Sequence, residues 1–173
     1  MFYELLKSRR SVRKFLDREM EKEKIDLILK SALLSPSSRA RRPWEFIVVT
    51  DRNTLNKLSK CREHSSGFLS GAPAGIVVAA DTELTDVWTE DASIASIIIQ
   101  LAAQSLGLGS CWIQVRQRPH DDMLSAGEYV KQVLNIPEKY AVESIIALGY
   151  PAGEMKPYDE KELRYEKIHY GEF

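Results

Sequence analysis

The stretch from Thr85 to Leu106 constrains the fold more than any other part of the chain. Small and branched apolar residues recur in it at spacings of three and four, and further isoleucines and leucines cover much of the remaining circumference. This spacing predicts a helix, and a helix that is apolar nearly all round is a buried helix. Gly107 is well placed to end it, because glycine accepts a positive φ. We therefore expect this helix at the centre of the fold or at a subunit interface.

Four other segments are apolar and rich in β-branched residues, and amphipathic segments lie between them. The expected strands are residues 44–50, 75–80, 109–115 and 142–149, and the further helices are residues 2–8, 19–34, 123–134 and a short one capped by Asp51 or Asn53. The chain of 173 residues fits one domain. Residues 152–173 form an extended C-terminal tail without a core-forming period, and its tyrosines favour a tail draped over another surface.

The composition is that of an ordinary globular protein and argues against several classes. There are 24 Lys and Arg residues against 25 Asp and Glu residues, so no global field attracts the protein to nucleic acid or to a membrane. The N-terminus has an acidic residue at position 4 and no long apolar core, unlike a signal peptide. With only Cys61 and Cys111 present, reduced thiols and a cytoplasmic location are expected. The three histidines lie in no metal-ligand spacing, so no metal site is expected.

Local charge is densest in residues 7–15, which carry five cations and two hydroxyls. In an extended segment, alternation places Arg9, Ser11 and Arg13 on one face and Arg10 on the other. Planar guanidinium groups match phosphate oxygens in pairs, and a hydroxyl adds a further bond. The stretch is interpreted as an anion site, with a solvated basic turn as the alternative.

A second basic loop, Arg39 to Arg42, raises the alternative of a nucleotide-binding or nucleic-acid-binding module without redox activity. Acidic residues in 19–23 and 160–166 dilute the positive field, and no recognition helix or aromatic platform accompanies the arginines. Nucleic acid is therefore not expected as a partner. No Walker loop, Gly-x-Ser-x-Gly or His-Glu-x-x-His motif is present, and the glycines at 107 and 109 follow a helix, the reverse of a dinucleotide fingerprint.

Six separated blocks of sequence form a recognisable set. They are Arg9-Arg10-Ser11-x-Arg13-x-Phe15, Ser35-Pro36-Ser37-Ser38 with Pro43-Trp44, Gly71-Ala72-Pro73 before a strand ending at Asp81, and residues 106–113, 148–152 and 165–170. In their order and spacing, these blocks resemble the FMN-dependent nitroreductase family over nearly the whole chain. The resemblance implies an α+β fold with a central, mostly antiparallel sheet of four to five strands flanked by helices. It also implies a homodimer with FMN at the interface, in which the C-terminal tail is exchanged with the partner subunit.

The resemblance further implies which residues bind FMN. Arg9, Arg10 and Ser11 would hold the phosphate and ribityl chain, and Arg13 would lie near the pyrimidine end of the flavin. Pro36, Ser37 and Ser38 would lie along the cofactor, and Trp112, Ile113 and Gln114 would lie against the isoalloxazine. Lys161 or Arg164 would approach the phosphate. A backbone N–H near Gln114 would face flavin N5. Many relatives have Asn where this chain has Ala40, and often Gly where it has Val115, which affects the expected substrate preference more than the cofactor.

The implied activity is that of an FMN-dependent NAD(P)H oxidoreductase. NAD(P)H would reduce the flavin at N5 and leave, and a nitroaromatic, quinone or similar electron-poor acceptor would then take the electrons at the same face. Because the cofactor supplies the difficult step, no catalytic side chain is required. A fixed cation, Arg13, would stabilise the negative charge of the reduced flavin. Flavin fragmentation and reductive dehalogenation are the alternatives within the family.

Overall fold

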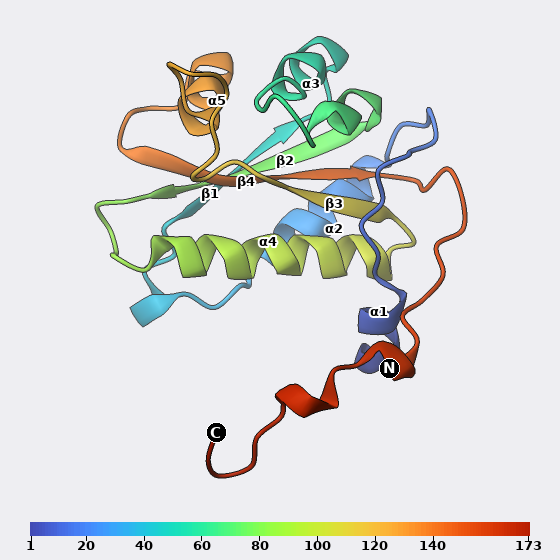
Figure 1. The fold of residues 1–173 in the computed structure, drawn as a ribbon. Helices are drawn as coiled ribbons and strands as arrows, with labels where there is room; N and C mark the ends of the chain where they lie inside the picture. Colours follow the sequence, from blue (N-terminus) through green and yellow to red (C-terminus); the bar gives the residue numbers. More distant parts are fainter.

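The computed structural model describes residues 1–173 as a central sheet between two layers of helices (Figure 1). The strands are β1 (Trp44–Val49), β2 (Ala74–Asp81), β3 (Gly109–Gln114) and β4 (Tyr140–Gly149), joined antiparallel in the order β1-β2-β4-β3. Helices α3 (Arg52–Leu58) and α5 (Ala126–Leu134) cover one face, and α2 (Lys22–Leu33) and α4 (Trp88–Ser105) cover the other. The expected α+β fold with an antiparallel sheet is confirmed, with four strands.

The two layers follow from the alternation of side chains in β2, whose eight residues are all buried. Ile76 and Val78 lie in a core cluster with Ile99 of α4, whereas Val77 lies in a cluster with Leu55 of α3 on the opposite face. A strand covered on both faces reads as a continuous apolar run, which is why this segment was recognisable in the sequence.

Helix α4 presents one apolar stripe to the sheet and a second one away from it. The stripe against the sheet consists of Ala92, Ala95, Ile99 and Ala103, all fully buried. The opposite stripe follows the same helical spacing with Ile94, Ile97, Ile98 and Leu101. Its members Ile94 and Ile97 are 37% and 38% exposed. The helix is central to the fold, as predicted, and still leaves an uncovered apolar surface. No helix of the protein combines the length and apolarity needed to cross a membrane.

Helix boundaries lie within a few residues of those predicted. Asp51 caps α3 by accepting a hydrogen bond from the Thr54 N–H at 2.8 Å. Helix α5 begins at Ala126 and not at Met123, because Ser125 caps it by accepting from the Glu128 N–H at 3.1 Å. Helix α4 begins at Trp88, three residues later than predicted, because residues 82–87 form turns.

Residues 9–15, here called the cationic segment, follow α1 (Phe2–Ser8) in an extended conformation and pack on the sheet. The Val12 N–H donates to the Ser110 C=O of β3 at 2.9 Å, and Ser11 forms a parallel bridge with Ser110. Gly109 permits this close approach, since a Cβ at that position would lie 2.7 Å from Val12 Cγ2. The segment therefore covers the beginning of the outer edge of β3.

A hydrogen-bonded cluster around Tyr150 ties α2 and the residues just before it to the end of β4. The Tyr150 hydroxyl donates to Glu21 Oε2 at 2.5 Å and accepts from Lys24 Nζ at 2.7 Å. The Arg18 guanidinium stacks 3.9 Å from the centre of the Tyr150 ring. The bond from Tyr150 is the main reason that the pKa of Glu21 is lowered to about 2.

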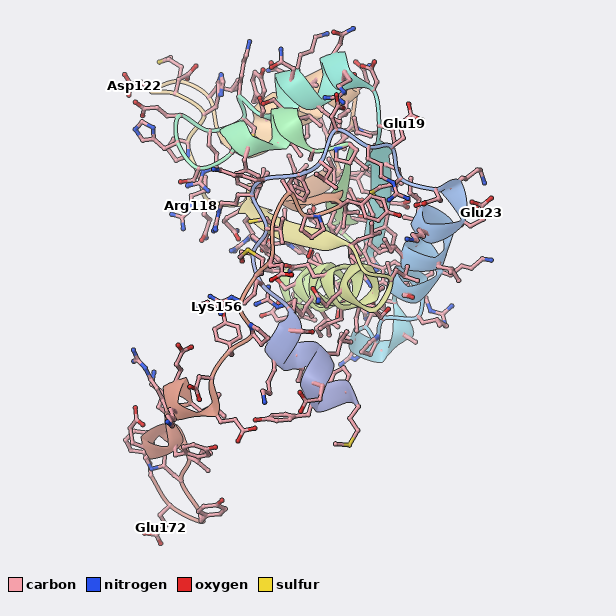
Figure 2. The ribbon with its side chains drawn as sticks, turned by 90° about the vertical axis from the view of Figure 1, so that its right-hand side faces the viewer. Glu19, Glu23, Arg118, Asp122, Lys156 and Glu172 are labelled. Carbon is pink, nitrogen blue, oxygen red and sulfur yellow. The ribbon has the colours of Figure 1, made fainter.

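The tail leaves β4 after Pro151 and meets α1. The Tyr158 N–H donates to the Lys7 C=O at 2.9 Å, and Lys7 Nζ lies 3.2 Å from Glu160 Oε1. Every residue from 152 to 173 is exposed. The tail therefore lies against α1 first and then runs away from the sheet (Figure 2).

The Tyr150 cluster predicts a stability effect that depends on pH. A carboxyl group whose folded-state pKa is lowered contributes stability above its ordinary pKa of 4.5 and loses it as pH falls toward 2. We expect Tyr150→Phe to lower the urea midpoint at pH 7, and the difference from wild type to shrink between pH 4.5 and 2. Tyr170→Phe, whose residue is 93% exposed, is the control. An equal deficit at both pH values would contradict this account.

Gly109→Ala should lower the free energy of unfolding by about 1–3 kcal/mol, because the added methyl group overpacks Val12. Gly67→Ala is the matched control, since a Cβ there meets nothing within 4 Å. Urea titration of both variants measures the effect. Equal losses from the two substitutions would mean that the contact between Val12 and Gly109 does not restrict this position.

Candidate functional site

The outer edge of β3 is open beyond the cationic segment. On one side the Val115 N–H donates to the Glu143 C=O of β4 at 3.1 Å, and on the other the Ser110 C=O accepts from Val12. Hydrogen-bonding directions alternate along an antiparallel strand, so the main-chain groups of Trp112 and Gln114 face outward, away from β4. The edge therefore presents outward N–H donors next to Ser11 and Val12, which pair with the beginning of β3.

Arg9, Ser11 and Arg13 lie on one face of the segment, as their alternation predicts. All three are close enough to the Cys111 thiol to lower its pKa, which burial raises more strongly. The Arg13 guanidinium lies 5.9 Å from the centre of the Phe68 ring, and no carboxylate pairs with Arg9 or Arg13. Two guanidinium groups without a carboxylate partner and a hydroxyl therefore flank the open edge, an arrangement that suits a phosphate.

Arg10 points to the opposite face of the segment. Its guanidinium stacks 4.2 Å from the centre of the Tyr158 ring and donates to the Lys156 C=O at 3.1 Å. Lys161 and Arg164 belong to the part of the tail that runs from Lys156, beside α1, to Glu172, far from the sheet (Figure 2). Within one chain, these cations are not brought together with Arg9 and Ser11.

The three predicted residues of β3 point to both faces of the sheet, Ile113 to one and Trp112 and Gln114 to the other. Ile113 is 1% exposed and packs in the core against α3 and α5. Trp112 packs on the α4 side, where its Nε1 donates to Gln114 Oε1 at 2.9 Å. The Gln114 Nε2 donates to the Arg116 C=O at 3.1 Å and to Glu143 Oε1 at 3.4 Å. The main chain of this strand therefore faces the open edge, while its side chains serve the core and a polar network behind it.

Pro36, Ser37 and Ser38 lie at the opposite end of α4 from the cationic segment. The Ser38 N–H donates to Asp91 Oδ1, in the first turn of α4, at 2.8 Å. At the other end of the helix, Gln104 Nε2 donates to Ser8 Oγ at 3.3 Å. Asp91 and Gln104 are 13 residues apart along α4, which corresponds to about 20 Å at 1.5 Å per residue. The two halves of the site predicted from sequence are therefore separated by most of the length of this helix within one chain.

The loop that follows Ser38 has a strained backbone, and buried polar atoms beside it lack hydrogen-bond partners. Its left-handed residues are Arg39 at φ 51°, Ala40 at φ 54° and Arg42 at φ 50°. Such conformations are costly for residues other than glycine and cluster at functional sites. The Ser37 Oγ holds the loop by accepting from the Arg42 N–H at 2.9 Å, and buried Asp91 Oδ2 and Trp44 Nε1 have no hydrogen-bond partner. This loop is the second candidate binding element.

Sequence reasoning missed two buried carboxylates, Glu143 in β4 and Asp91 in α4, each 3% exposed. Glu143 stands alone within an otherwise apolar strand, whereas Asp91 follows Glu90 in the first turn of α4. Carboxylates are almost never fully buried unless they are paired, so the isolated acid inside a predicted core strand was an available signal for Glu143. Asp91 holds Ser38, and Glu143 holds Gln114, so each supports a residue that the sequence did single out.

Known proteins resemble this chain over its whole length. The sequence profile of the nitroreductase family matches residues 6–66 and 57–150. A protein of Archaeoglobus fulgidus with the provisional name NADH dehydrogenase/NAD(P)H nitroreductase is 40% identical, covering 95% of this chain and 94% of its own. An iodotyrosine deiodinase of Thermotoga neapolitana is 26% identical over 94% of this chain and 95% of its own. The structure of an FMN-dependent nitroreductase from Clostridium difficile R20291 is 53% identical, with a TM-score of 0.98 and 99% of both chains covered. The chain belongs to the nitroreductase family.

Proposed function

We propose that the protein is an FMN-dependent NAD(P)H oxidoreductase whose binding site is shared between two protomers. The observation that carries this proposal is the open edge of β3, where the outward N–H of Gln114 lies beyond the unpaired Arg9 and Arg13. The FMN-dependent nitroreductase that is 53% identical supports FMN as the cofactor. The NAD(P)H nitroreductase name of the archaeal relative supports NAD(P)H as the electron donor.

The donor groups at this edge suit FMN. Arg9 and Ser11 would bind the phosphate, Arg13 would lie at the pyrimidine end of the ring, and the Gln114 N–H would face N5. FMN supplies hydride acceptance and release at N5, and the protein's own groups bind and orient it. NAD(P)H and a nitroaromatic, quinone or similar electron-poor acceptor would occupy the same face in turn, which is a ping-pong sequence.

A homodimer would complete the site. The outer stripe of α4 is apolar and exposed, and the tail leaves Tyr165 and Ile168 61% and 53% exposed. Contiguous apolar surface of this kind marks an interaction site. A second copy packed on α4 would cover the stripe and would bring the loop at Ser37 and Ser38 of one subunit to the β3 edge of the other. In this arrangement residues 1–173 form one domain, and the tail of residues 152–173 embraces the partner, with Lys161 or Arg164 near a phosphate.

Reductive dehalogenation is the second candidate function, favoured by the likeness to the deiodinase of Thermotoga neapolitana. It would use the same flavin edge with a haloaromatic acceptor. The two candidates share the cofactor and differ in the molecule that accepts the electrons.

FMN titration followed by steady-state assays tests the proposed function. Protein prepared under mild conditions should bind FMN and quench its fluorescence. It should then oxidise NADH or NADPH with a nitroaromatic or a quinone, and comparison with iodotyrosine and with oxygen alone separates the two candidates. Protein that neither binds FMN nor quenches its fluorescence would contradict the proposal and would favour a nucleotide-binding module without redox activity.

Arg9→Ala and Arg13→Ala should have different effects. Loss of one charge-assisted phosphate contact at Arg9 should weaken FMN binding about ten- to hundredfold. Arg13→Ala should mainly lower the reduction potential of bound FMN, because it removes a cation beside the developing negative charge. Arg52→Ala, a surface cation paired with Asp17, is the control. Fluorescence titration and spectroelectrochemistry measure the two effects, and equal changes in affinity and potential from both variants would contradict the division of roles.

The proposed dimer interface predicts the effect of a charge on α4. Ile97→Glu places a carboxylate in the middle of the exposed apolar stripe, where a partner would have to bury it. We expect monomers by sedimentation analysis and a parallel loss of FMN binding. Met123→Glu, at a residue that is 93% exposed in a loop, is the control and should leave both properties unchanged. A monomeric Ile97→Glu protein with normal FMN affinity would rule out a shared site.

A further inference from the structure

Glu143 occupies an irregular point of the sheet, behind the open edge. The pairing of β2 with β4 shifts register between Val78 and Ala79, opposite Glu143, which is left without a partner in the register. Its C=O accepts from both the Val115 and the Arg116 N–H groups at 3.1 Å each. Two N–H groups that share one carbonyl are typical of a β-bulge. The main chain of Glu143 therefore fixes the path of the chain immediately after Gln114.

The side chain of Glu143 fixes the same segment a second time. Its Oε1 accepts from Gln114 Nε2 at 3.4 Å and lies 3.5 Å from Ser93 Oγ of α4, and Gln114 Oε1 in turn accepts from Trp112 Nε1. Both ends of the Gln114 carboxamide are thus held. The bonds from the Val115 and Arg116 N–H groups to the Glu143 C=O restrain the backbone next to Gln114, and the carboxamide contacts restrain its side chain, so the Gln114 N–H keeps its outward direction.

Core packing gives no reason for an acid at this position. The Glu143 side chain is 4% exposed, and its Oε2 has no hydrogen-bond partner, with the nearest cation, Arg116 Nε, at 4.0 Å. An unsatisfied buried acceptor lowers stability, and apolar residues often replace buried charges without loss. Apart from the Ser93 hydroxyl of α4, the groups that this carboxylate meets belong to the edge segment from Gln114 to Arg116.

We propose that Glu143 is a positioning residue that orients the Gln114 edge and that its charge sets the reduction potential of the flavin bound there. This inference rests on the proposed function, because it requires FMN at the β3 edge. An anionic carboxylate behind the edge disfavours the extra negative charge of the reduced cofactor, whereas a neutral carboxyl group does not. The carboxyl group itself need not touch the flavin.

The surroundings of Glu143 allow both charge states. Burial is the main influence and raises its pKa, while hydrogen bonds from Gln114 and Ser93 and the charge of Arg116 lower it. The other charged group that faces it is Glu90 of α4, which raises its pKa further. The carboxyl group is therefore neutral at low pH and becomes charged at a pH above its ordinary value of 4.5. Its influence on the potential must then grow with pH.

The test is a redox titration of the FMN-loaded protein at several pH values, with wild type and Glu143→Gln compared. Glu143→Gln keeps the shape and the acceptor for Gln114 and removes the charge. Its potential should match wild type at the lowest pH and rise above it as pH increases, up to about a tenfold change in the ratio of oxidised to reduced flavin, or about 30 mV for a two-electron couple. The inference would be overturned if the reduction potentials of wild type and Glu143→Gln were the same, or if they differed by an equal amount at every pH.

Two further variants keep the test decisive. Asp81→Asn removes another buried carboxylate of the sheet, whose pKa Lys139 lowers, so any offset that it causes should not vary over the same pH range. Arg116→Gln changes a partly exposed residue and should move the pH dependence to higher pH, since it removes the cation that favours ionised Glu143. If Glu143→Gln does not fold or load FMN, an unmoved pH dependence in Arg116→Gln overturns the inference. Failure of wild type to bind FMN would instead contradict the proposed function.

Discussion

Helix α4 is the constraint on which the rest of the structure depends. Its inner stripe, built from small residues and Ile99, lets the helix lie close against β2 and β4. Its length separates the loop at Ser38 from the cationic segment at Arg9, because each is attached near one end of the helix. Its outer stripe leaves apolar surface uncovered. One helix therefore explains the core on its face of the sheet and the division of the candidate site into two halves, which a second subunit would unite in the proposed function.

The hydrogen-bond donors of the candidate site come from the main chain of β3 and from the side chains of Arg9, Ser11 and Arg13. Residues 11 and 12 satisfy the beginning of the β3 edge, and no strand pairs with the edge at Trp112 and Gln114, where only the Gln114 C=O accepts from a side chain, Arg62 Nη1 at 3.4 Å. An unpaired strand edge is usually a liability, but here it offers fixed donors at a position flanked by cations. The buried carboxylates each accept a hydrogen bond from one half of the site, Asp91 from the Ser38 N–H and Glu143 from Gln114 Nε2. In the proposed function the cofactor supplies the difficult chemical step, which would account for the absence of a catalytic motif in the sequence.

Much of the fold was predictable because its signals are local. The continuous apolar run of β2, the periodicity of α4 and the cap at Asp51 each belong to one short segment. The directions taken by Trp112 and Ile113 were less accessible, since they depend on register against β4. The distance between Ser38 and Arg9 within one chain depends on tertiary packing, so no local pattern in the sequence gives it. The role of Glu143 depends on a β-bulge in its pairing with neighbouring strands, which no local sequence pattern predicts.

The most direct test of the shared site is subunit complementation. One variant carries Arg9→Ala with Arg13→Ala, and the other carries Ser37→Ala with Ser38→Ala, so that each homodimer lacks one half of every site. In an equal mixture of subunits, half of the dimers are mixed and each mixed dimer contains one intact site, so about a quarter of the wild-type FMN binding should return. Recovery to that level is the result that the account predicts. No recovery from a mixture in which mixed dimers are demonstrated would contradict it.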